Sequence, residues 1–462
     1  MTFRSYDSSG YRLLHEGCIA LSQVETNGMR IDVDYLNRAI AYTKRKIEKI
    51  LYEIGHDKIF KVWKKEFGIR TNIGSGEQLG KILFSVMKYP CLARTKTGRP
   101  KTDETALNAV DLDFVRNFLK LKKLRKAKST YLEGILRETT NGYLHPFFNL
   151  NTTRTFRSSS DHPNFQNMPI RDPNIAKLVR RAFVARPNHQ IVETDYSGAE
   201  ICNATCYHRD PRMISYIKDK RKDLHRDMAG QCFILPKKEI TKEIRYCGKN
   251  MFVFPQFYGD YYIHCAENLW KAIDQMKLKR GDGYDLYSHL ETEGIYELGN
   301  CDPDEEPKEG TFEKHIQEIE YNFWNRLFKV YAQWKKDWYY TYLKKGYFDT
   351  LTGFRIEGFY GRNEIINYPV QGSAFHWLLW CLIRIIKLLK KYRMKTLITG
   401  QIHDSIVGDV YKKELRNYLE ICEQVMTVDI RKHWKWIIVP LSIEAEVAPV
   451  GGSWYEKEKV KI

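Results

Sequence analysis

Hydrophobic and polar positions follow a helical period through most of the first 135 residues. Residues 40–54 predict a lysine-rich amphipathic helix, and residues 114–136 predict a second basic helix. Between them, residues 72–78 predict a helix start whose exposed amides suit a phosphate contact. Residues 211–345 are again mostly helical in pattern, whereas strand-like runs occur in residues 140–210 and from residue 346 to the end. The whole pattern predicts an α+β protein.

Two aspartates that are far apart in the sequence stand beside strand-like runs. Residues 191–194 lead into Asp195, and residues 396–399 and 406–410 flank Asp404. If these strands lie side by side in one sheet, the two carboxylates converge and can bind a pair of divalent cations. Such a pair stabilises the attacking and leaving oxygens in phosphoryl transfer, and Mg²⁺ suits this chemistry. A strand-end aspartate is more often a solvated turn residue, so the pattern alone does not define a site.

Composition narrows the class of protein. The 462 residues carry a net charge of +18 and are 43% hydrophobic, which predicts a globular protein with a polyanionic partner. A merely basic protein without such a partner is the alternative on charge alone. The ten cysteines include no C-x-x-C pair, and Cys202 and Cys206 are interpreted as buried thiols rather than zinc ligands. No apolar run of membrane-spanning length and no signal-peptide pattern is recognised, so we expect a cytoplasmic location, in a host if the protein is viral, and no secretion.

Several short motifs accompany the two aspartates. Those around the aspartates are D-Y-S-G-A-E at 195–200 and H-D-S at 403–405. The others are K-S-T-Y at 128–131, T-F-R-S-S-S at 155–160, P-N-F-Q-N-M-P at 163–169, R-Y-C-G-K at 245–249, F-Y-G at 257–259 and P-V-Q-G at 369–372. In this order the motifs resemble those of the A-family DNA polymerases, the group of bacterial DNA polymerase I. The resemblance extends over residues 15–455.

The resemblance implies a right-hand fold with a thumb, a palm built on an antiparallel sheet, and helical fingers. We expect the thumb and an N-terminal palm-flanking segment in residues 1–140, the palm in 141–210 and 346–462, and the fingers in 211–345. A segment at about 272–310 is interpreted as an insertion. The first thumb-like match, residues 21–32, begins so early that we expect no proofreading domain. The implied activity is primer-dependent, template-directed DNA synthesis from dNTPs on primer-template DNA.

The resemblance also assigns roles to residues. Asp195, Asp404 and the backbone carbonyl of Tyr196 are expected to hold two Mg²⁺ ions, which Mn²⁺ can replace. Lys249 is expected to protonate the leaving pyrophosphate. The other implied nucleotide-binding residues are Arg245 and His225, which join Lys249 in a cationic group, Glu200, which excludes a ribose 2′-hydroxyl, and Phe254 and Tyr258. The implied DNA-binding residues are Arg157, Asn164, Gln166, Gln371 and His403.

Two features depart from the family pattern. Ser405 stands where the family usually has a third carboxylate. The interval between Lys249 and Gly259 is one residue longer than the family spacing and contains Pro255. We therefore expect a distorted helix, through a proline kink or a π-type turn, with Phe254 and Tyr258 in the two aromatic positions. In the alternative register, a regular helix ends before Pro255 and Phe257 takes the tyrosine position.

Two other functions fit part of this pattern. A single-subunit RNA polymerase shares the palm and the lysine-bearing helix, but it would lack Glu200. A catalytically inactive DNA-binding protein derived from a polymerase would not need to retain Asp195, Asp404, Arg245 and Lys249. Candidate protein partners are a separate exonuclease, a helicase-primase and a processivity factor, and the sequence does not choose among them.

Overall fold

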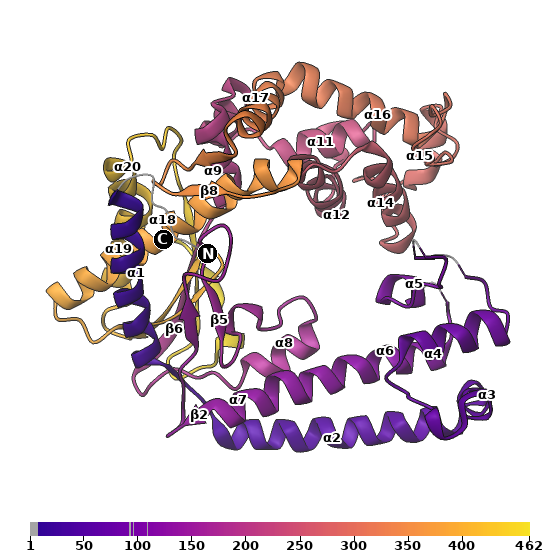
Figure 1. The fold of residues 1–462 in the computed structure, drawn as a ribbon, viewed down its shortest axis with the longest axis horizontal. Coiled ribbons are helices and arrows are strands. Elements are labelled where there is room, and N and C mark those ends of the chain that lie inside the picture. Colours follow the sequence, from indigo (N-terminus) through magenta and orange to yellow (C-terminus); the bar gives the residue numbers. More distant parts are fainter. Residues whose placement is uncertain (1–7, 92–93, 96, 109) are drawn as a thin grey trace.

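The protein is described by a computed structural model that covers residues 8–462 apart from 92–93, 96 and 109. The first seven residues, and with them the start at which no signal-peptide pattern is recognised, lie outside the described part. At the centre is a five-stranded antiparallel sheet with the strand order β12-β11-β6-β10-β9 (Figure 1). Its strands are β6 (His189–Tyr196), β9 (Leu397–Ile402), β10 (Ser405–Tyr411), β11 (Ile443–Val447) and β12 (Glu458–Val460).

The middle of the sheet is formed by β6 and β10. Their β-branched residues, among them Val192, Ile406 and Val407, are buried and suit a pleated, packed surface. Ser405 pairs with Asp195 in the antiparallel register. The prediction that the two aspartate-bearing segments form neighbouring strands is therefore confirmed.

Helices of the sheet region share one hydrophobic core with the sheet. Figure 1 shows α1 and α19 beside α18 next to the strands. The helices of this region are α1 (Ser8–Asn27), α7 (Glu133–Glu138), α8 (Pro173–Arg180), α9 (Ala199–His208), α18 (Arg362–Lys391), α19 (Leu415–Glu423) and α20 (Ile430–His433). Three small sheets complete it, formed by β1 (Met29–Arg30), β2 (Thr139–Thr140) and β3 (Tyr143–Leu144), by β4 (Phe147–Asn149) and β5 (Ser159–Asp161), and by β7 (Tyr347–Asp349) and β8 (Arg355–Glu357).

The central helix α18 corrects one expectation from the sequence. Its most apolar window has a mean hydropathy of 1.4, so by length and composition this helix could cross a membrane. However, 78% of that window is buried inside the protein. A helix that is apolar on all sides is typical of a protein core as well as of a membrane. The apolar composition of α18 is therefore explained by its place in the core.

Two helical bodies with cores of their own face each other across the space beside the sheet (Figure 1). The N-terminal body contains α2 (Val33–His56), α3 (Lys58–Phe67), α4 (Gly76–Gly80), α5 (Glu104–Asn108) and α6 (Asp113–Lys126). The second body contains α10 (Pro211–Lys218), α11 (Leu224–Cys232), α12 (Lys242–Cys247), α13 (Phe254–Tyr258), α14 (Tyr262–Gln275), α15 (Leu286–Thr292), α16 (Phe312–Asn322) and α17 (Lys329–Lys345). These bodies and the sheet region support the proposed division into thumb, fingers and palm, whose boundaries stay a prediction.

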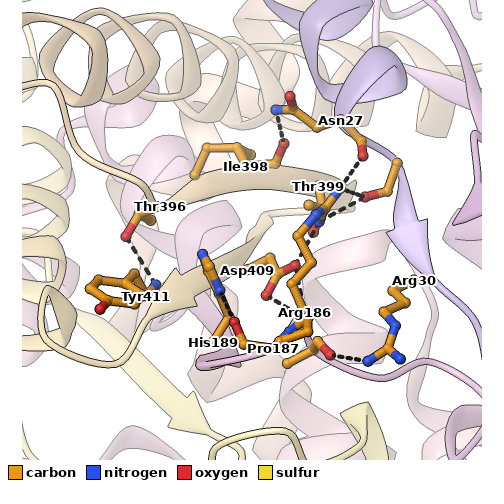
Figure 2. A network of polar contacts seen from close by, with 12 residues as sticks. Asn27, Arg30, Arg186, Pro187, His189, Thr396, Ile398, Thr399, Asp409 and Tyr411 are labelled. Atoms are coloured by element: carbon orange, nitrogen blue, oxygen red, sulfur yellow. Dashed lines mark hydrogen bonds and ion pairs between the residues drawn. The ribbon is translucent and has the colours of Figure 1, made fainter.

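A buried ion pair joins the sheet to the end of α1 (Figure 2). Arg186 donates to Asp409 at 2.6 Å, and the two side chains are 17% and 5% exposed. The same guanidinium donates to the backbone carbonyls of Asn27 and Gly28, where the chain leaves α1 towards the N-terminal helical body. Removing one member of a buried pair leaves an uncompensated charge, which costs about 3–5 kcal/mol. This contact therefore fixes the junction between the sheet and the N-terminal body.

Candidate active site

The sheet brings Asp195 and Asp404 together at neighbouring strand ends. Asp195 is the penultimate residue of β6, and its antiparallel partner on β10 is Ser405. Asp404 precedes Ser405 in the tight turn between β9 and β10, in which His403 has a φ of +50°. After β6, Gly198 at φ +70° turns the chain into α9, whose first turn contains Glu200. Short-range backbone geometry thus places three carboxylates at one end of the sheet.

The two aspartates repel each other. Burial, followed by the charges of Asp404 and Glu193, raises the pKa of Asp195 well above its ordinary value. Burial also raises the pKa of Asp404, and the Glu200 carboxylate adds to the effect. The Oδ1 atom of Asp195 is buried and has no hydrogen-bond partner. A divalent cation would supply the missing partner and neutralise the repulsion.

Asp195 and Asp404 fit a divalent cation that takes only some of its ligands from the protein. Within the described ranges, no group of three or more His, Cys, Asp or Glu side chains has a metal-binding arrangement. Mg²⁺ usually takes one or two carboxylates and completes its shell with water and substrate phosphates. The Tyr196 side chain does not contribute, because its hydroxyl donates to the carbonyl of Met426 at 2.9 Å inside the core. The expected ligand from this residue is its backbone carbonyl, and that role stays a prediction.

A further carboxylate near the aspartates, that of Glu193, was not among the predicted site residues. Ser405 donates to Glu193 at 3.0 Å, and Trp454 donates to the same carboxylate at 2.9 Å. Although burial raises the pKa of Glu193, the ion pair with Lys457 outweighs it and the pKa is lowered. The sequence pattern could have indicated Glu193, because residues two apart in a strand share a face and Glu193 lies two residues before Asp195. Lys457 compensates Glu193 and leaves Asp195 and Asp404 as the uncompensated pair.

The helix that was expected to bind nucleotide is distorted, as predicted. A π-helical turn over Gly248–Val253 separates α12 from α13, and Gly259 at φ +91° follows the last residue of α13. Pro255 lies in the first turn of α13, so the π turn rather than a proline kink absorbs the extra residue. Phe257 is 8% exposed and packs among the aromatic residues in the core of the second helical body. Tyr258 is exposed and Phe254 is half-buried, which fits the predicted register, but which aromatic residues meet the nucleotide stays a prediction.

Tyr258 connects this helix to the sheet region, and Phe254 contacts residues of its own helical body. The Tyr258 hydroxyl donates to the Glu200 carboxylate, and both residues line a small cavity with Gln371. The Lys249 Nζ lies 5.2 Å from the centroid of the Phe254 ring, and the His225 ring contacts the same ring at 5.6 Å. The geometry therefore gathers the residues expected to bind nucleotide into one face.

The charges on this face differ in part from the expectation. Arg245 donates to Asp223 at 2.7 Å, so its charge is paired in this structure. Burial, followed by the charges of Lys249 and Arg245, lowers the pKa of His225 to about 4. His225 is therefore neutral at pH 7, which corrects its inclusion in the cationic group. Its buried Nδ1 has no partner and can form a hydrogen bond instead.

The residues expected to contact DNA lie beside the aspartates. Arg157 is 4.0 Å from Glu200, and its charge lowers the pKa of His403 further after burial has lowered it. The backbone around residue 155 approaches α18 closely, since a Cβ on Gly372 would lie 2.6 Å from the Thr155 carbonyl. Asn164 is exposed at the start of a short 3-10 turn and accepts from Ser160 at 3.5 Å.

Gln401 was not among the predicted residues, although it lies two residues before His403. It accepts from Gln166 at 2.8 Å and donates to the His403 carbonyl at 2.6 Å. Because these contacts fix the orientation of Gln166 and of the turn before Asp404, Gln401 supports both. Its role could be recognised only after the strands were placed.

Cys202 and Cys206 are buried thiols, as interpreted from the sequence. All ten cysteines are free thiols. Burial, with a contribution from Cys206, raises the pKa of the Cys202 thiol to about 12, and burial raises that of Cys206 to about 11. Protonated buried thiols are poor metal ligands.

A sheet that carries two converging aspartates, with two helical bodies that face each other beside it, is the arrangement of a right-hand polymerase. The family model of DNA polymerase family A matches residues 39–279 and 324–456, and the chain belongs to this family. The unmatched residues between these stretches lie close to the insertion predicted at about 272–310.

Relatives with known names agree with the family. DNA polymerase I of Bacillus subtilis (strain 168) is 28% identical over 447 residues, which is 95% of this chain and 44% of that protein. The thermostable DNA polymerase I of Thermus aquaticus is 25% identical over 451 residues, which is 94% of this chain and 46% of that protein. The chain thus spans less than half the length of these relatives.

A solved structure has the same fold. The POL domain of Pol1 from M. smegmatis, in complex with DNA primer-template and dNTP, matches with a TM-score of 0.71 at 23% identity. The match covers 95% of this chain and 69% of that chain. The predicted fold class, an α+β right hand, is confirmed.

The repulsion between the aspartates predicts a trade between stability and cation binding. In metal-free buffer at pH 8, Asp195→Asn should raise the free energy of unfolding by roughly 1–2 kcal/mol, because it removes one of two repelling charges. Millimolar Mn²⁺ should stabilise the unchanged protein but not this variant. Urea unfolding with EDTA or Mn²⁺ measures both effects, and Asp302→Asn, an exposed change in the insertion, is the control. A variant that is less stable than the unchanged protein in EDTA would contradict the electrostatic account.

Proposed function

We propose that the protein is a template-directed, primer-dependent DNA polymerase that adds deoxynucleoside monophosphates to a primer 3′-hydroxyl. The observation that carries this proposal is the uncompensated pair Asp195 and Asp404 at neighbouring strand ends, in a chain that belongs to DNA polymerase family A. The complex of the M. smegmatis Pol1 domain with primer-template and dNTP supports the choice of substrates.

The proposed cofactor is a pair of Mg²⁺ ions, which Mn²⁺ can replace. Asp195, Asp404 and the backbone carbonyl of Tyr196 would hold them. Bound cations would lower the pKa of the primer 3′-hydroxyl and neutralise charge on the triphosphate and the leaving pyrophosphate. The unpartnered Oδ1 of Asp195 and the raised pKa values of both aspartates support this assignment.

Residues of the distorted helix would bind the incoming nucleotide. Lys249, for which the structure gives no ion pair among the residues it describes, would contact the phosphates and protonate the leaving pyrophosphate. Arg245 would exchange its ion pair with Asp223 for a phosphate contact, and neutral His225 would donate a hydrogen bond. Phe254 would pack against the sugar and base.

The pair Tyr258 and Glu200 would select the sugar. Their hydrogen bond holds both side chains at the edge of the site, where a ribose 2′-hydroxyl would meet the Glu200 carboxylate. This proposal favours DNA synthesis over the alternative of a single-subunit RNA polymerase.

The surface of the site would hold primer-template DNA. The net charge of +18 favours a polyanion through release of counterions. Arg157, Asn164, Gln166 and Gln371 would contact the minor-groove acceptors that every base pair presents, and His403 would contact the primer terminus. A cytoplasmic location, in a host if the protein is viral, and partners such as a separate exonuclease, a helicase-primase or a processivity factor belong to the same proposal.

A primer-extension gel tests the activity and excludes an inactive DNA-binding protein. With Mg²⁺ and dNTPs, the protein should extend a labelled primer, and Asp404→Asn should lose at least about a thousandfold in rate because a cation ligand is removed. DNA binding by Asp404→Asn should stay within about threefold of the unchanged protein.

The same assay tests proofreading. We propose that these 462 residues do not trim a mismatched 3′ end. The proposal would be overturned if the unchanged protein trimmed the mismatched end and Asp404→Asn did not. In the extension assay, a normal rate for Asp404→Asn would show that this residue does not belong to the site.

The helix register gives a prediction for nucleotide use. Phe254→Ala should raise the KM for dNTP about tenfold, because the ring would no longer pack against the nucleotide. Phe257→Ala should instead lower the free energy of unfolding by about 3–5 kcal/mol, because its ring is buried in the fingers core. Steady-state single-nucleotide incorporation and urea unfolding separate the two effects. A large KM effect confined to Phe257→Ala would show that the nucleotide meets Phe257.

A further inference from the structure

A buried lysine lies behind the nucleotide-binding helix. Lys335 on α17 is 9% exposed, and lysine is almost never buried to this extent without a partner. Its ammonium donates to the backbone carbonyl of Gln256 at 3.3 Å and lies 3.5 Å from the centroid of the Trp324 ring. Within the part of the chain that the structure describes, Lys335 forms no ion pair at 4 Å or less. A carbonyl and an aromatic face therefore offset the cost of burying this charge.

The carbonyl that Lys335 contacts belongs to a hub of polar contacts. The Gln256 side chain is 1% exposed, accepts from Trp324 at 2.7 Å and donates to Glu320. Its backbone carbonyl also accepts from the N–H of Gly259 at 3.3 Å, which closes the last turn of α13. Carbonyls at a helix C-terminus carry partial negative charge, so a cation there is stabilising. Gln256 thus connects α16 and α17 to the turn that contains Tyr258.

Tyr258 lies between the two ends of this closing turn. Its hydroxyl reaches Glu200 on the other side, next to Asp404. The backbone at Gly259 is closely packed, because a Cβ at this residue would lie 2.5 Å from the Asn363 side chain. The orientation of the Tyr258 side chain therefore depends on the contacts that fix the last turn of α13 on its opposite side.

We propose that Lys335 is a positioning residue, whose buried ammonium group holds the last turn of α13 so that Tyr258 meets Glu200 beside the incoming nucleotide. This inference rests on the proposed function. Lys335 would support the nucleotide-binding site from the opposite side of α13, without itself contacting nucleotide or metal.

The groups around Lys335 make this contact sensitive to pH. Burial, followed by the charge of Arg362 on α18, lowers the pKa of Lys335 to about 7, and Glu320 on α16 opposes the shift. Other titratable groups beside Lys335 are Tyr331 on the same helix, whose ring centroid lies 5.0 Å from the Lys335 Nζ, His208 on α9, and Asp260, which follows α13. The ammonium is present below this pKa and is lost as the pH rises through it. The hold on α13 should weaken over the same range.

Steady-state incorporation of a single nucleotide tests the proposal. Lys335→Met should raise the KM for dNTP about tenfold, change kcat by less than about threefold and leave the Kd for primer-template unchanged. The preference for dNTP over rNTP should fall, because Tyr258 no longer supports Glu200. Lys336→Met removes the same charge from the exposed side chain next to Lys335 on α17, and it should stay within about twofold of the unchanged protein.

Lys335→Arg keeps the charge and serves as the second variant. It should recover most of the lost nucleotide affinity, and its KM should stay flat from pH 6.5 to 8.5, where the KM of the unchanged protein rises. This comparison applies even if Lys335→Met does not fold. A KM for Lys335→Met within twofold of normal, or equal pH profiles for Lys335→Arg and the unchanged protein, would overturn the proposal.

Amide hydrogen exchange separates this inference from the proposed function, because it needs no substrate. Residues 254–261 should exchange faster in Lys335→Met than in Lys336→Met, and the N-terminal helical body should not change. If the unchanged protein did not extend primers, the proposed function would fail, and this measurement would still decide whether Lys335 holds the turn. Equal exchange of residues 254–261 in the two variants would overturn the role of Lys335.

Discussion

The repulsion between Asp195 and Asp404 is the interaction on which the account of this protein depends. The antiparallel pairing of β6 and β10 forces the two carboxylates to neighbouring positions. Left alone, two like charges at a half-buried site would favour protonation or local opening, and their raised pKa values reflect this cost. The buried core of the sheet region holds them in place. A site of this kind is strained without cations and relaxed with them.

Ion pairs and burial neutralise several charged groups around Asp195 and Asp404, so the electrostatic repulsion is concentrated between these two aspartates. Lys457 forms an ion pair with Glu193, the other carboxylate of β6, although the charge of Glu193 still contributes to the raised pKa of Asp195. Asp223 compensates Arg245, and burial neutralises His225. On the nucleotide-binding face, Lys249 is the cation for which the described residues provide no ion pair. The hydrogen bond between Tyr258 and Glu200 joins the segment that carries Lys249 to α9, which follows Asp195 in the chain.

The sequence predicted the parts of the site that depend on local pattern. Apolar runs identified β6, β9 and β10, and counting residues from Lys249 to Gly259 predicted the distortion that the π turn provides. It could not predict charges that are set by distant partners. Lys457, Asp223 and Gln256 meet their partners only after the chain has folded, so the compensation of Glu193, the pairing of Arg245 and the burial of Lys335 gave no local signal. The apolar window of α18 was not recognised in the sequence, and its place in the core became evident only from the fold.

The most direct test is to locate cations in a complex with primer-template DNA and a non-hydrolysable dNTP analogue. Anomalous scattering from crystals grown with Mn²⁺ would show them independently of activity. The account predicts two Mn²⁺ ions between the nucleotide phosphates and the carboxylates of Asp195 and Asp404, with Glu193 still bound to Lys457. Ions bound elsewhere, or a nucleotide that sits in the complex without any ion at Asp195 and Asp404, would contradict it.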